Sequence, residues 1–251
     1  MILYFSGTGN SLAIARKIAE ATDDQIMPLN DVARMELTNE KRIGLVFPTY
    51  DFNMPPAVRN YIPVLKINPQ AYVFAVNTCG AQAGNSLWTL RRLLHDKSIQ
   101  LAYAHKIRVP DNSAIAFGRN PNEQAWKFDR FASRLDRIIA DVKAQKHELH
   151  YAWWGVPGWL TALPSIENKL LLTFHPVVNE DKCTGCGTCA KVCPIRNIVV
   201  DQRAGIGPHC TICLGCVHVC PHQAISVNGR EALKERQYRH PDIKLKDLIK
   251  R

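Results

Sequence analysis

The cysteines are the residues whose type and spacing point most directly to chemistry. Eight of the nine lie between positions 183 and 220, where CTGCGTCAKVCP (183–194) is followed by CTICLGCVHVCP (210–221). Each run reads Cys-x2-Cys-x2-Cys-x3-Cys-Pro, and the second is offset from the first by 27 positions. Thiolates at this spacing bind iron–sulfur clusters, so the sequence predicts two [4Fe–4S] clusters.

The same spacing predicts which cysteines share a cluster. Three thiolates two residues apart wrap one face of a cubane, whereas the fourth lies beyond a turn and completes the other cluster. The expected ligand sets are Cys183, Cys186, Cys189 and Cys220 for one cluster, and Cys210, Cys213, Cys216 and Cys193 for the second. A pair of zinc sites is the alternative, but zinc gives no reason for the third Cys and the x3-Cys-Pro ending in both copies. The pattern resembles that of bacterial two-cluster ferredoxins.

Smaller features surround these cysteines. Backbone N–H groups are expected to approach the sulfurs beside four small residues, Gly185, Gly187, Ala190 and Gly215. Three histidines stand close to the ligands, namely His209, His218 and His222. They are candidates for tuning a potential or relaying protons, but exposed surface positions are the more common outcome for such residues.

A second candidate site lies at the other end of the chain, where residues 4–11 read YFSGTGNS. An apolar run, a tight polar loop and a helical pattern follow one another, which is an arrangement that binds anions. A dinucleotide fingerprint would need Gly in place of Leu12, and no Lys follows for a nucleoside-triphosphate loop. The hydroxyl and amide side chains that remain, with the backbone N–H groups, suit a terminal phosphomonoester.

The elements that must position this loop follow from apolar periodicity. Strands are expected at residues 1–5, 25–29, 43–47, 71–76 and 101–109, and helices at 11–21, 56–65, 85–95 and 122–146. Alternating strands and helices predict a parallel sheet covered on both faces, with the ligand at the carboxyl ends of its strands. Three loops are expected to converge there, at residues 6–11, 48–54 and 77–84.

The first loop resembles the phosphate-binding loop of flavodoxins, which holds FMN. The resemblance implies a flavodoxin-like, doubly wound, five-stranded parallel sheet of order 2-1-3-4-5, with the flavin ring held by the loops after strands three and four. The implied FMN-binding residues are Ser6, Gly7, Thr8, Gly9, Asn10, Ser11, Pro48, Thr49, Tyr50, Asp51, Phe52, Asn77, Thr78, Cys79 and Gly80. Tyr50, with Phe52, is the candidate for stacking on the ring, or else covers the sheet edge.

Two further features of the sequence near this site are a missing Gly and a lone Cys. Many flavodoxins have a Gly in the loop after strand three, but residues 49–54 contain none. Cys79 is expected to be a small buried residue because its neighbours supply neither a base nor a partner thiol.

The chain is expected to have four parts. These are an FMN-binding domain (1–148), an aromatic connection (149–176), a small α+β two-[4Fe–4S] ferredoxin domain (177–228) and a basic tail (229–251). The aromatic residues of the connection are Tyr151, Trp153, Trp154, Trp159 and Phe174. They favour a clasp between the two domains over a membrane-surface anchor, because prolines and glycines interrupt any amphipathic helix. The tail either docks an acidic redox partner or packs along the first domain.

Composition restricts the class of protein. Apolar residues make up 46% and charged residues 22% of the 251 residues, which is ordinary for a globular protein. The net charge of +10 is spread evenly, at +5 in residues 1–150 and +5 in 151–251, which argues against a nucleic-acid-binding role. No stretch predicts a membrane span or signal peptide, and a cytoplasmic protein is the simplest interpretation.

The whole chain resembles the fused flavodoxin–ferredoxin proteins of anaerobic bacteria and archaea. That resemblance implies an electron-transfer protein whose partners are ferredoxins or larger redox enzymes. A cluster passes single electrons whereas a flavin accepts one or two, so the pair links one- and two-electron chemistry. An FMN-dependent reductase of a small acceptor is the alternative, and a redox sensor that uses its clusters structurally is a third hypothesis. The oligomeric state does not follow from the sequence.

Overall fold

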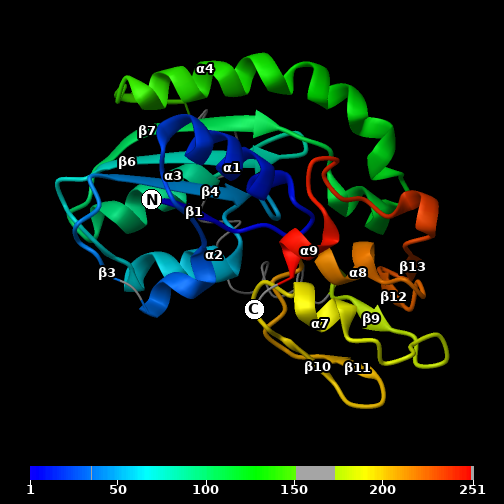
Figure 1. Ribbon diagram of the computed structural model, residues 1–251. Coiled ribbons are helices and arrows are strands. Elements are labelled where there is room, and N and C mark those ends of the chain that lie inside the picture. The colour runs from blue at the N-terminus through cyan, green and yellow to red at the C-terminus, as the bar shows by residue number, and fades with distance from the viewer. Residues whose placement is uncertain (35, 151–172, 250–251) are drawn as a thin grey trace.

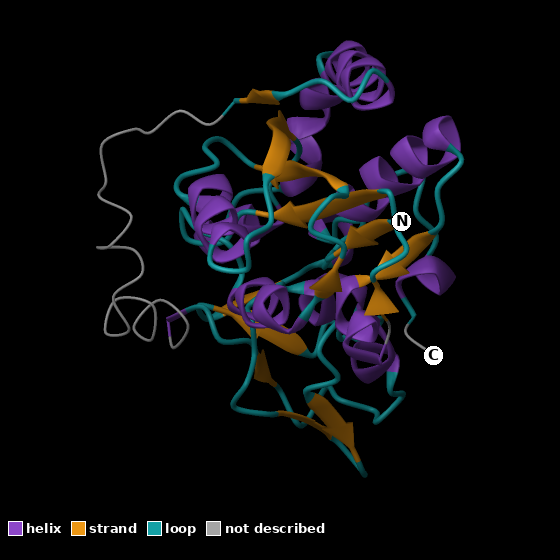
Figure 2. Ribbon diagram, turned by 90° about the vertical axis from the view of Figure 1, so that its left-hand side faces the viewer, coloured by secondary structure: helices purple, strands orange, loops and turns teal. Residues whose placement is uncertain are grey.

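The computed structural model describes residues 1–34, 36–150 and 173–249, and the predicted connection aromatics at 151–159 therefore lie outside the described residues. Two modules follow one another along the chain, an α/β module and a smaller one that carries the cysteines (Figure 1). They lie against each other, and the C-terminal residues run back along the first module (Figures 1 and 2).

A parallel sheet forms the centre of the first module. Its strands are β1 (Ile2–Tyr4), β2 (Ile26–Pro28), β4 (Arg42–Pro48), β6 (Tyr72–Cys79), β7 (Leu101–Arg108) and β8 (Glu148–Leu149), in the spatial order β2-β1-β4-β6-β7-β8. The first five reproduce the predicted order 2-1-3-4-5, and every pairing between them is parallel. The flavodoxin-like fold class is therefore confirmed. The two-residue strand β8 adds a sixth position that the sequence pattern did not predict.

Helices cover both faces of this sheet. They are α1 (Asn10–Thr22), α2 (Pro56–Tyr61), α3 (Ser86–His95) and α4 (Phe131–Lys143). Helices α1 and α4 pack on one face in a cluster with Ile2, Val46 and Phe74, while α2 and α3 pack on the other with Leu3 and Leu45. Strands β4 and β6 are apolar on both faces because both faces are buried, which is typical of parallel sheets.

The long helix predicted at residues 122–146 was wrong as a single element. Residues Pro121–Asp129 form the 3-10 helix η4, and α4 begins only at Phe131. The Asn120 side chain accepts a hydrogen bond from the Asn122 backbone N–H and caps η4, while Phe131 is buried against α1. The predicted helix is therefore divided into a 3-10 helix and an α-helix that begins at the buried Phe131. The other short elements are the pair β3 (Glu36–Leu37) and β5 (Lys66–Ile67), η1 (Leu29–Arg34), η2 (Ile62–Val64) and η3 (Asn112–Phe117).

The second module is an α+β unit built from two similar halves. Its elements are β9 (Val177–Val178), α7 (Thr188–Val192), β10 (Ile198–Val200), β11 (Ala204–Ile206), α8 (Gly215–Val219), β12 (Ile225–Val227) and β13 (Arg230–Glu231). Strands β10 and β11 form a hairpin, and β9, β12 and β13 form a three-stranded antiparallel sheet. Helices α7 and α8 start 27 positions apart, as the repeat of the cysteine pattern predicts.

Left-handed backbone positions repeat at the same interval. Gly185 and Ile212 both have positive φ (70° and 49°), and so do Gly187 and Leu214 (73° and 58°). A β-branched residue in this region is strained, so the loop geometry around the cysteines is imposed even where Gly is absent. The second half therefore keeps the backbone of the first at the cost of strain at Ile212.

The tail packs on the first module, which is the second of the two expectations for it. After η5 (Lys234–Arg236), the His240 N–H donates to the Thr8 carbonyl (3.0 Å). Ile243 lies against the phosphate-loop residue Gly9, where a Cβ would come within 3.0 Å of it. The short helix α9 (Leu245–Leu248) is held to α1 by an ion pair between Asp247 and Arg16 (3.0 Å).

Candidate functional site

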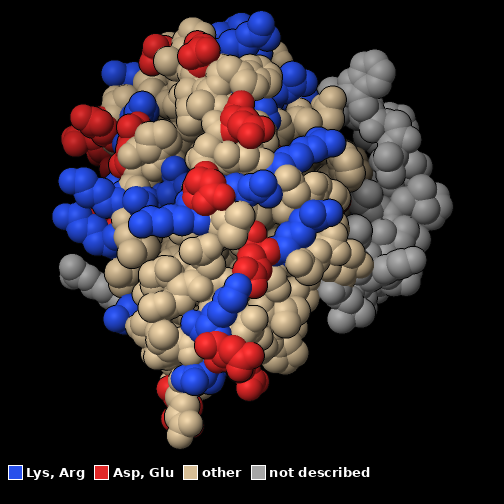
Figure 3. All heavy atoms as spheres, turned by 90° about the vertical axis from the view of Figure 1, so that its right-hand side faces the viewer, with Lys and Arg blue, Asp and Glu red and all other residues tan. Residues whose placement is uncertain are grey.

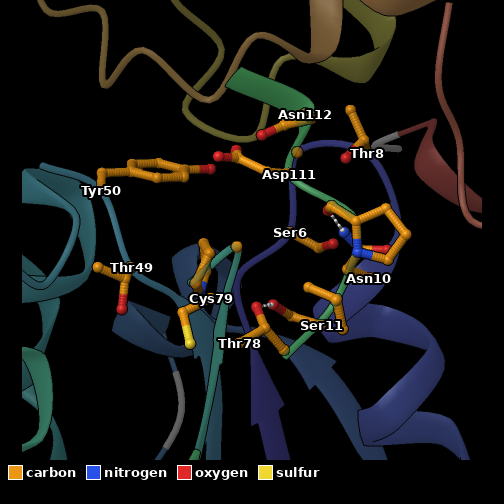
Figure 4. A pocket seen from close by; sticks show the side chains of 15 residues that line it. Ser6, Thr8, Asn10, Ser11, Thr49, Tyr50, Thr78, Cys79, Asp111 and Asn112 are labelled. Carbon is orange, nitrogen blue, oxygen red and sulfur yellow. Dashed lines mark hydrogen bonds between the residues drawn. The ribbon is translucent and has the colours of Figure 1, made fainter. Parts of the chain in front are cut away.

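The loop between β1 and α1 forms one wall of a cavity at the carboxyl ends of the strands (Figure 4). Gly9 is left-handed (φ 101°) and ends the loop, so that the helix begins at Asn10. Ser6 Oγ accepts the Gly9 N–H (3.1 Å), and Ser11 Oγ lies 2.9 Å from Thr78 Oγ1 on β6. Because the first N–H groups of a helix have no intrahelical acceptor, this wall presents donors to the cavity.

The loops after β4 and β6 form the opposite wall. Thr49 Oγ1 donates to Asn77 Oδ1 (2.8 Å), and Asn77 is fully buried, so this amide orients Thr49 from behind the wall. The Tyr50 ring faces the cavity and points toward Asp111 (Figure 4). Burial, followed by the nearby Cys213 and Cys210 thiols, raises the pKa of Tyr50 well above its usual value. Tyr50 is therefore an uncharged flat surface at the cavity wall.

Two predicted residues after Tyr50 turn away from this cavity. Tyr50 and Asn53 exchange backbone hydrogen bonds of 2.9 and 2.8 Å, and Asp51 and Phe52 between them both have positive φ. In this tight turn the Phe52 side chain is 58% exposed. Phe52 is therefore not placed to stack on a ring in the cavity, and Tyr50 is the aromatic residue that is.

Eleven of the fifteen predicted FMN-binding residues line this cavity, namely Ser6, Gly7, Thr8, Asn10, Ser11, Pro48, Thr49, Tyr50, Thr78, Cys79 and Gly80. Gly9, Asp51, Phe52 and Asn77 are not among its lining residues. Gly9 and Asn77 support the walls through the contacts given above. Cys79 is 3% exposed, and burial raises the pKa of its thiol to about 11, as expected for a small buried residue.

The loop after β7 completes the cavity and was missed by the sequence reasoning. Val109, Pro110, Asp111 and Asn112 line it. The sequence could have indicated this loop. Residues 101–109 were expected to form a strand of the same sheet, and the loop that follows such a strand lies at the same edge as the other loops. The Asp111 carboxylate caps η3 by accepting from Ser113 N–H (2.9 Å) and Oγ (2.7 Å).

The donor set of the cavity suits a phosphomonoester joined to a flat ring. Its hydroxyl groups come from Ser6, Thr8, Ser11, Thr49 and Thr78, and no Lys or Arg is among its lining residues. Such a site holds a phosphate through N–H and O–H donors and the helix dipole. The residues present therefore fit a group such as FMN: the α1 terminus and the hydroxyl groups would hold its phosphate, and Tyr50 would face its ring.

The predicted first set of cysteines lines one cavity of the second module. Cys183, Cys186, Cys189 and Cys220 meet there, in an open space of about 320 Å³. The Ala204 N–H donates to Cys183 Sγ (3.4 Å), and the Ala224 N–H donates to Cys220 Sγ (3.3 Å). Hydrogen bonds from Thr188 lower the pKa of Cys186, whereas burial raises that of Cys189.

The predicted second set lines another cavity of nearly equal size, about 310 Å³. Cys193, Cys210, Cys213 and Cys216 meet there. The Asn197 N–H donates to Cys193 Sγ (3.3 Å), and the Ile212 N–H donates to Cys210 Sγ (3.4 Å). Of the predicted small residues, Ala190 donates its backbone N–H to the Cys189 thiol. The hydrogen bonds described above come from other residues, namely Ala204, Ala224, Asn197 and Ile212.

A buried hydroxyl in this second cavity supports the cluster assignment. Thr211 is 3% exposed, and its Oγ1 has no hydrogen-bond partner among the described residues. A buried donor without an acceptor is costly, and a cluster sulfur would supply one. Among the described residues no group of three or more His, Cys, Asp or Glu side chains is arranged around a single ion. Four thiols lining one cavity suit a cubane, in which each thiol binds a different iron.

The two cysteine cavities differ in depth and in what lies beside them. The first cavity has one exposed thiol, Cys186, and one half-buried thiol, Cys183, whereas the second has one half-buried thiol, Cys210, and no exposed one. Burial, followed by neighbouring thiols, raises the pKa of Cys216 well above its usual value. The second cavity is therefore an interior site, and the first reaches the surface.

The second cavity abuts the wall of the candidate FMN site. The Asn112 side chain donates to the Cys213 carbonyl (2.9 Å), and Asn112 also lines the FMN cavity. A Cβ placed on Gly7 would lie 2.5 Å from that same carbonyl oxygen, so only Gly permits this approach. The phosphate loop and the inner cysteine loop are in direct contact.

Of the three histidines, only His218 departs from the surface position that was considered more common. It is 3% exposed, its Nε2 lies 2.9 Å from the Asn112 carbonyl, and its Nδ1 accepts the Tyr238 N–H (3.0 Å). Tyr238 Oη in turn donates to Asn10 Oδ1. His209 and His222 are exposed. His218 therefore joins the second module, the tail and the phosphate loop.

Comparison with known proteins gives one family match and several structural likenesses. A family model described as a 4Fe–4S binding domain matches residues 176–199, which contain the first cysteine run. A search of curated proteins finds no match. None of the helices in the described part of the chain has the length and apolar character of a membrane span.

The similar solved structures include flavodoxins and a flavin enzyme. A flavodoxin from the domain Archaea is 15% identical, with 57% of this chain and 95% of that chain covered and a TM-score of 0.41. The Megasphaera elsdenii flavodoxin is 18% identical (42% and 82% covered, TM-score 0.33). An FMN-dependent NADH-azoreductase from Bacillus anthracis is 11% identical (57% and 98% covered, TM-score 0.40).

Proposed function

We propose that this protein passes electrons between two [4Fe–4S] clusters and FMN, and so links one-electron and two-electron redox partners. A flavodoxin-like α/β module joined to a 4Fe–4S binding segment supports the proposal, as does the resemblance of the sequence to fused flavodoxin–ferredoxin proteins. The ligands would be the two crossed sets of cysteines given above. The observation that carries the proposal is the contact of the Cys213 backbone with both Gly7 and Asn112 at the FMN cavity.

The order of the centres follows from burial. The outer set includes the exposed Cys186, so a partner protein would exchange single electrons there. The inner set has no exposed thiol and contacts the wall of the FMN cavity through Cys213, so it would pass those electrons on to the flavin. Bound FMN would supply a centre that accepts one or two electrons, whereas each cluster passes one electron at a time.

In this scheme the residues of the chain bind the flavin and orient one another around it. The α1 terminus and the surrounding hydroxyl groups hold the phosphate, and Tyr50 packs against the ring. Asn77 fixes Thr49, and Asp111 fixes the start of η3. No residue is required as a nucleophile or general acid, because a carrier transfers electrons only.

Anaerobic purification with iron, sulfide and flavin analysis tests the proposal. The expected result is two [4Fe–4S] clusters and one FMN in each chain. Substituting Cys213→Ser should remove the inner cluster and stop rapid reduction of the flavin by an external one-electron donor, while FMN stays bound. The matched change Cys79→Ser, in the FMN wall but outside both cysteine cavities, should leave both clusters in place. Absence of flavin, or zinc in place of iron, would refute the proposal.

Stopped-flow oxidation separates a carrier from the alternative, a reductase of a small acceptor. A carrier should react rapidly with ferredoxins and slowly with small organic acceptors. Saturable, rapid oxidation by a small acceptor would favour the reductase.

A further inference from the structure

A large basic groove lies on the first module, away from both cysteine cavities. It has a volume of about 700 Å³ and runs between the outer edge of β7 and the segment formed by η4 and α4. Strand β8 pairs only with Tyr103 and Ala104, so within the described residues the second half of β7, residues 105–108, borders the groove. The space is in the size range of small-molecule sites, about 300–1,000 Å³.

The charged side chains that line this groove in the described part of the chain are all cationic. Among the described residues, its lining includes six cationic side chains, Lys106, Arg108, Lys127, Arg130, Arg134 and Arg137, and no Asp or Glu. Arg130, Arg134 and Arg137 have the spacing that places side chains on one face of a helix. On the face of the molecule drawn in Figure 3, Lys and Arg side chains are interspersed with Asp and Glu, whereas the described residues of the groove lining include no Asp or Glu.

The interactions of these cations leave most of the charge uncompensated. The Arg108 side chain donates to the Ala81 carbonyl (3.0 Å), and Lys127 donates to the Gly80 carbonyl (2.7 Å). These acceptors are neutral. Within the described part of the chain, the one carboxylate paired with a groove cation is Asp141, at 4.0 Å from Arg137 Nε. An anion entering the groove would therefore meet cations that are not already neutralised.

Two further side chains define what kind of anion fits. Trp126 lines the groove and is 57% exposed. Lys127 Nζ lies 5.9 Å from its ring centroid, and the exposed part of the ring remains open for stacking. His105, on the sheet side, has a pKa lowered by burial and then by His150, Arg134 and Arg137, which is a sign of positive potential there. Guanidinium groups bind phosphate oxygens in a bidentate manner.

We infer that this groove binds a nucleoside diphosphate group, with the phosphates on Arg130 and Arg134 and the base on Trp126. A small ligand is favoured over an acidic protein because the cations line a recess, whereas a protein partner covers a surface of about 800 Å² per side. The site is distinct from the FMN cavity but borders it, since Gly80 lines that cavity and its carbonyl accepts from Lys127 of the groove. Binding here does not depend on the proposed electron transfer.

Calorimetric titration of the full, cofactor-loaded protein with ADP tests this inference. ADP should bind with an affinity that falls as NaCl is raised, because the contacts are between charges. The double variant Arg130→Glu/Arg134→Glu should weaken ADP binding at least tenfold. Trp126→Ala should weaken binding of ADP by several-fold but leave that of inorganic pyrophosphate unchanged.

A matched control lies on the same helix. Lys143 is exposed in the last turn of α4 and is not a lining residue, so Lys143→Glu makes the same kind of charge change outside the groove and should preserve ADP binding. The inference is overturned if ADP does not bind at millimolar concentration, or if Lys143→Glu weakens binding as much as the double variant. It is equally overturned if adenosine or pyrophosphate binds as tightly as ADP, or if poly-glutamate binds more tightly, which would indicate an acidic protein partner.

Discussion

Gly7 is the residue at which the two modules approach most closely. A Cβ there would come within 2.5 Å of the Cys213 carbonyl oxygen, a backbone atom that cannot move without shifting the inner cysteine loop. Gly7→Ala should therefore separate the phosphate loop from that loop. We expect weaker FMN retention and slower flavin reduction, by an order of magnitude or more, because electron transfer and binding both depend on this contact.

Gly205→Ala is a suitable control for Gly7→Ala. Gly205 lies in β11, where a Cβ would meet its nearest neighbour only at 3.8 Å. This variant should keep flavin content and the reduction rate of the parent protein. If Gly7→Ala behaves in the same way, the modules do not exchange electrons across this contact.

Thr211 and Thr184 occupy equivalent positions in the two cysteine runs, but only Thr211 is buried with an unpartnered hydroxyl. If that hydroxyl donates to the inner cluster, Thr211→Val should lower the potential of one cluster. Loss of one hydrogen bond of about 0.5–1.5 kcal/mol corresponds to about 20–60 mV for one electron. An anaerobic redox titration followed by EPR measures it. The exposed Thr184 side chain hydrogen-bonds to Cys186, so Thr184→Val should shift the potential of the outer cluster only. A Thr211→Val variant with unchanged cluster potentials would contradict this role.

At the scale of elements, the tail is the segment whose docking depends on pH. His240 is 3% exposed and lies against Phe128 and Phe131, with ring centroids 5.1 and 6.1 Å away. Burial lowers the pKa of His240 to about 4, with a further lowering by Lys17 opposed by Asp242. The neutral form is therefore favoured in the folded protein, and its Nδ1 accepts the Asp242 N–H (3.2 Å).

The sign of the pH effect follows from this lowered pKa. The unfolded chain takes up the proton at about pH 6.5, so the contribution of His240 is complete above that pH and is lost as the pH falls toward 4. We expect a loss of up to about 3 kcal/mol of stability over this window. Thermal unfolding at a series of pH values measures it, and His240→Gln should flatten the profile. A slope unchanged by His240→Gln would show that other groups cause the acid sensitivity.

The elements of the first module were largely predictable from the sequence, because buried parallel strands are continuous apolar runs and the helices between them have a clear period. The break between η4 and α4 was not, since it depends on the tertiary burial of Phe131. The grouping of the eight cysteines into two cluster sets is a prediction from their spacing, and each predicted set lines one cavity. The burial of His218 and the role of Asn112 were not, because both arise from contact between modules that the local sequence does not encode.

At the scale of the whole molecule, one chain of contacts connects the candidate centres. The inner cysteine loop touches the phosphate loop through Gly7 and the β7 loop through Asn112, while Tyr238 of the tail donates to Asn10. The hydrophobic cores merge as well, since Cys213 packs in the core of the first module and Val192 packs with α1 and α4. The modules should therefore unfold together rather than as independent units.

The central claim is that FMN and two clusters function as one connected set. An anaerobic redox titration followed by absorbance and EPR tests it most directly, because it counts the centres and orders them by potential. The account predicts one flavin and two [4Fe–4S] clusters, with the EPR signal of one cluster altered by the redox state of the flavin beside it. A protein that titrates without flavin, with a single cluster, or with clusters unaffected by the flavin would contradict the account.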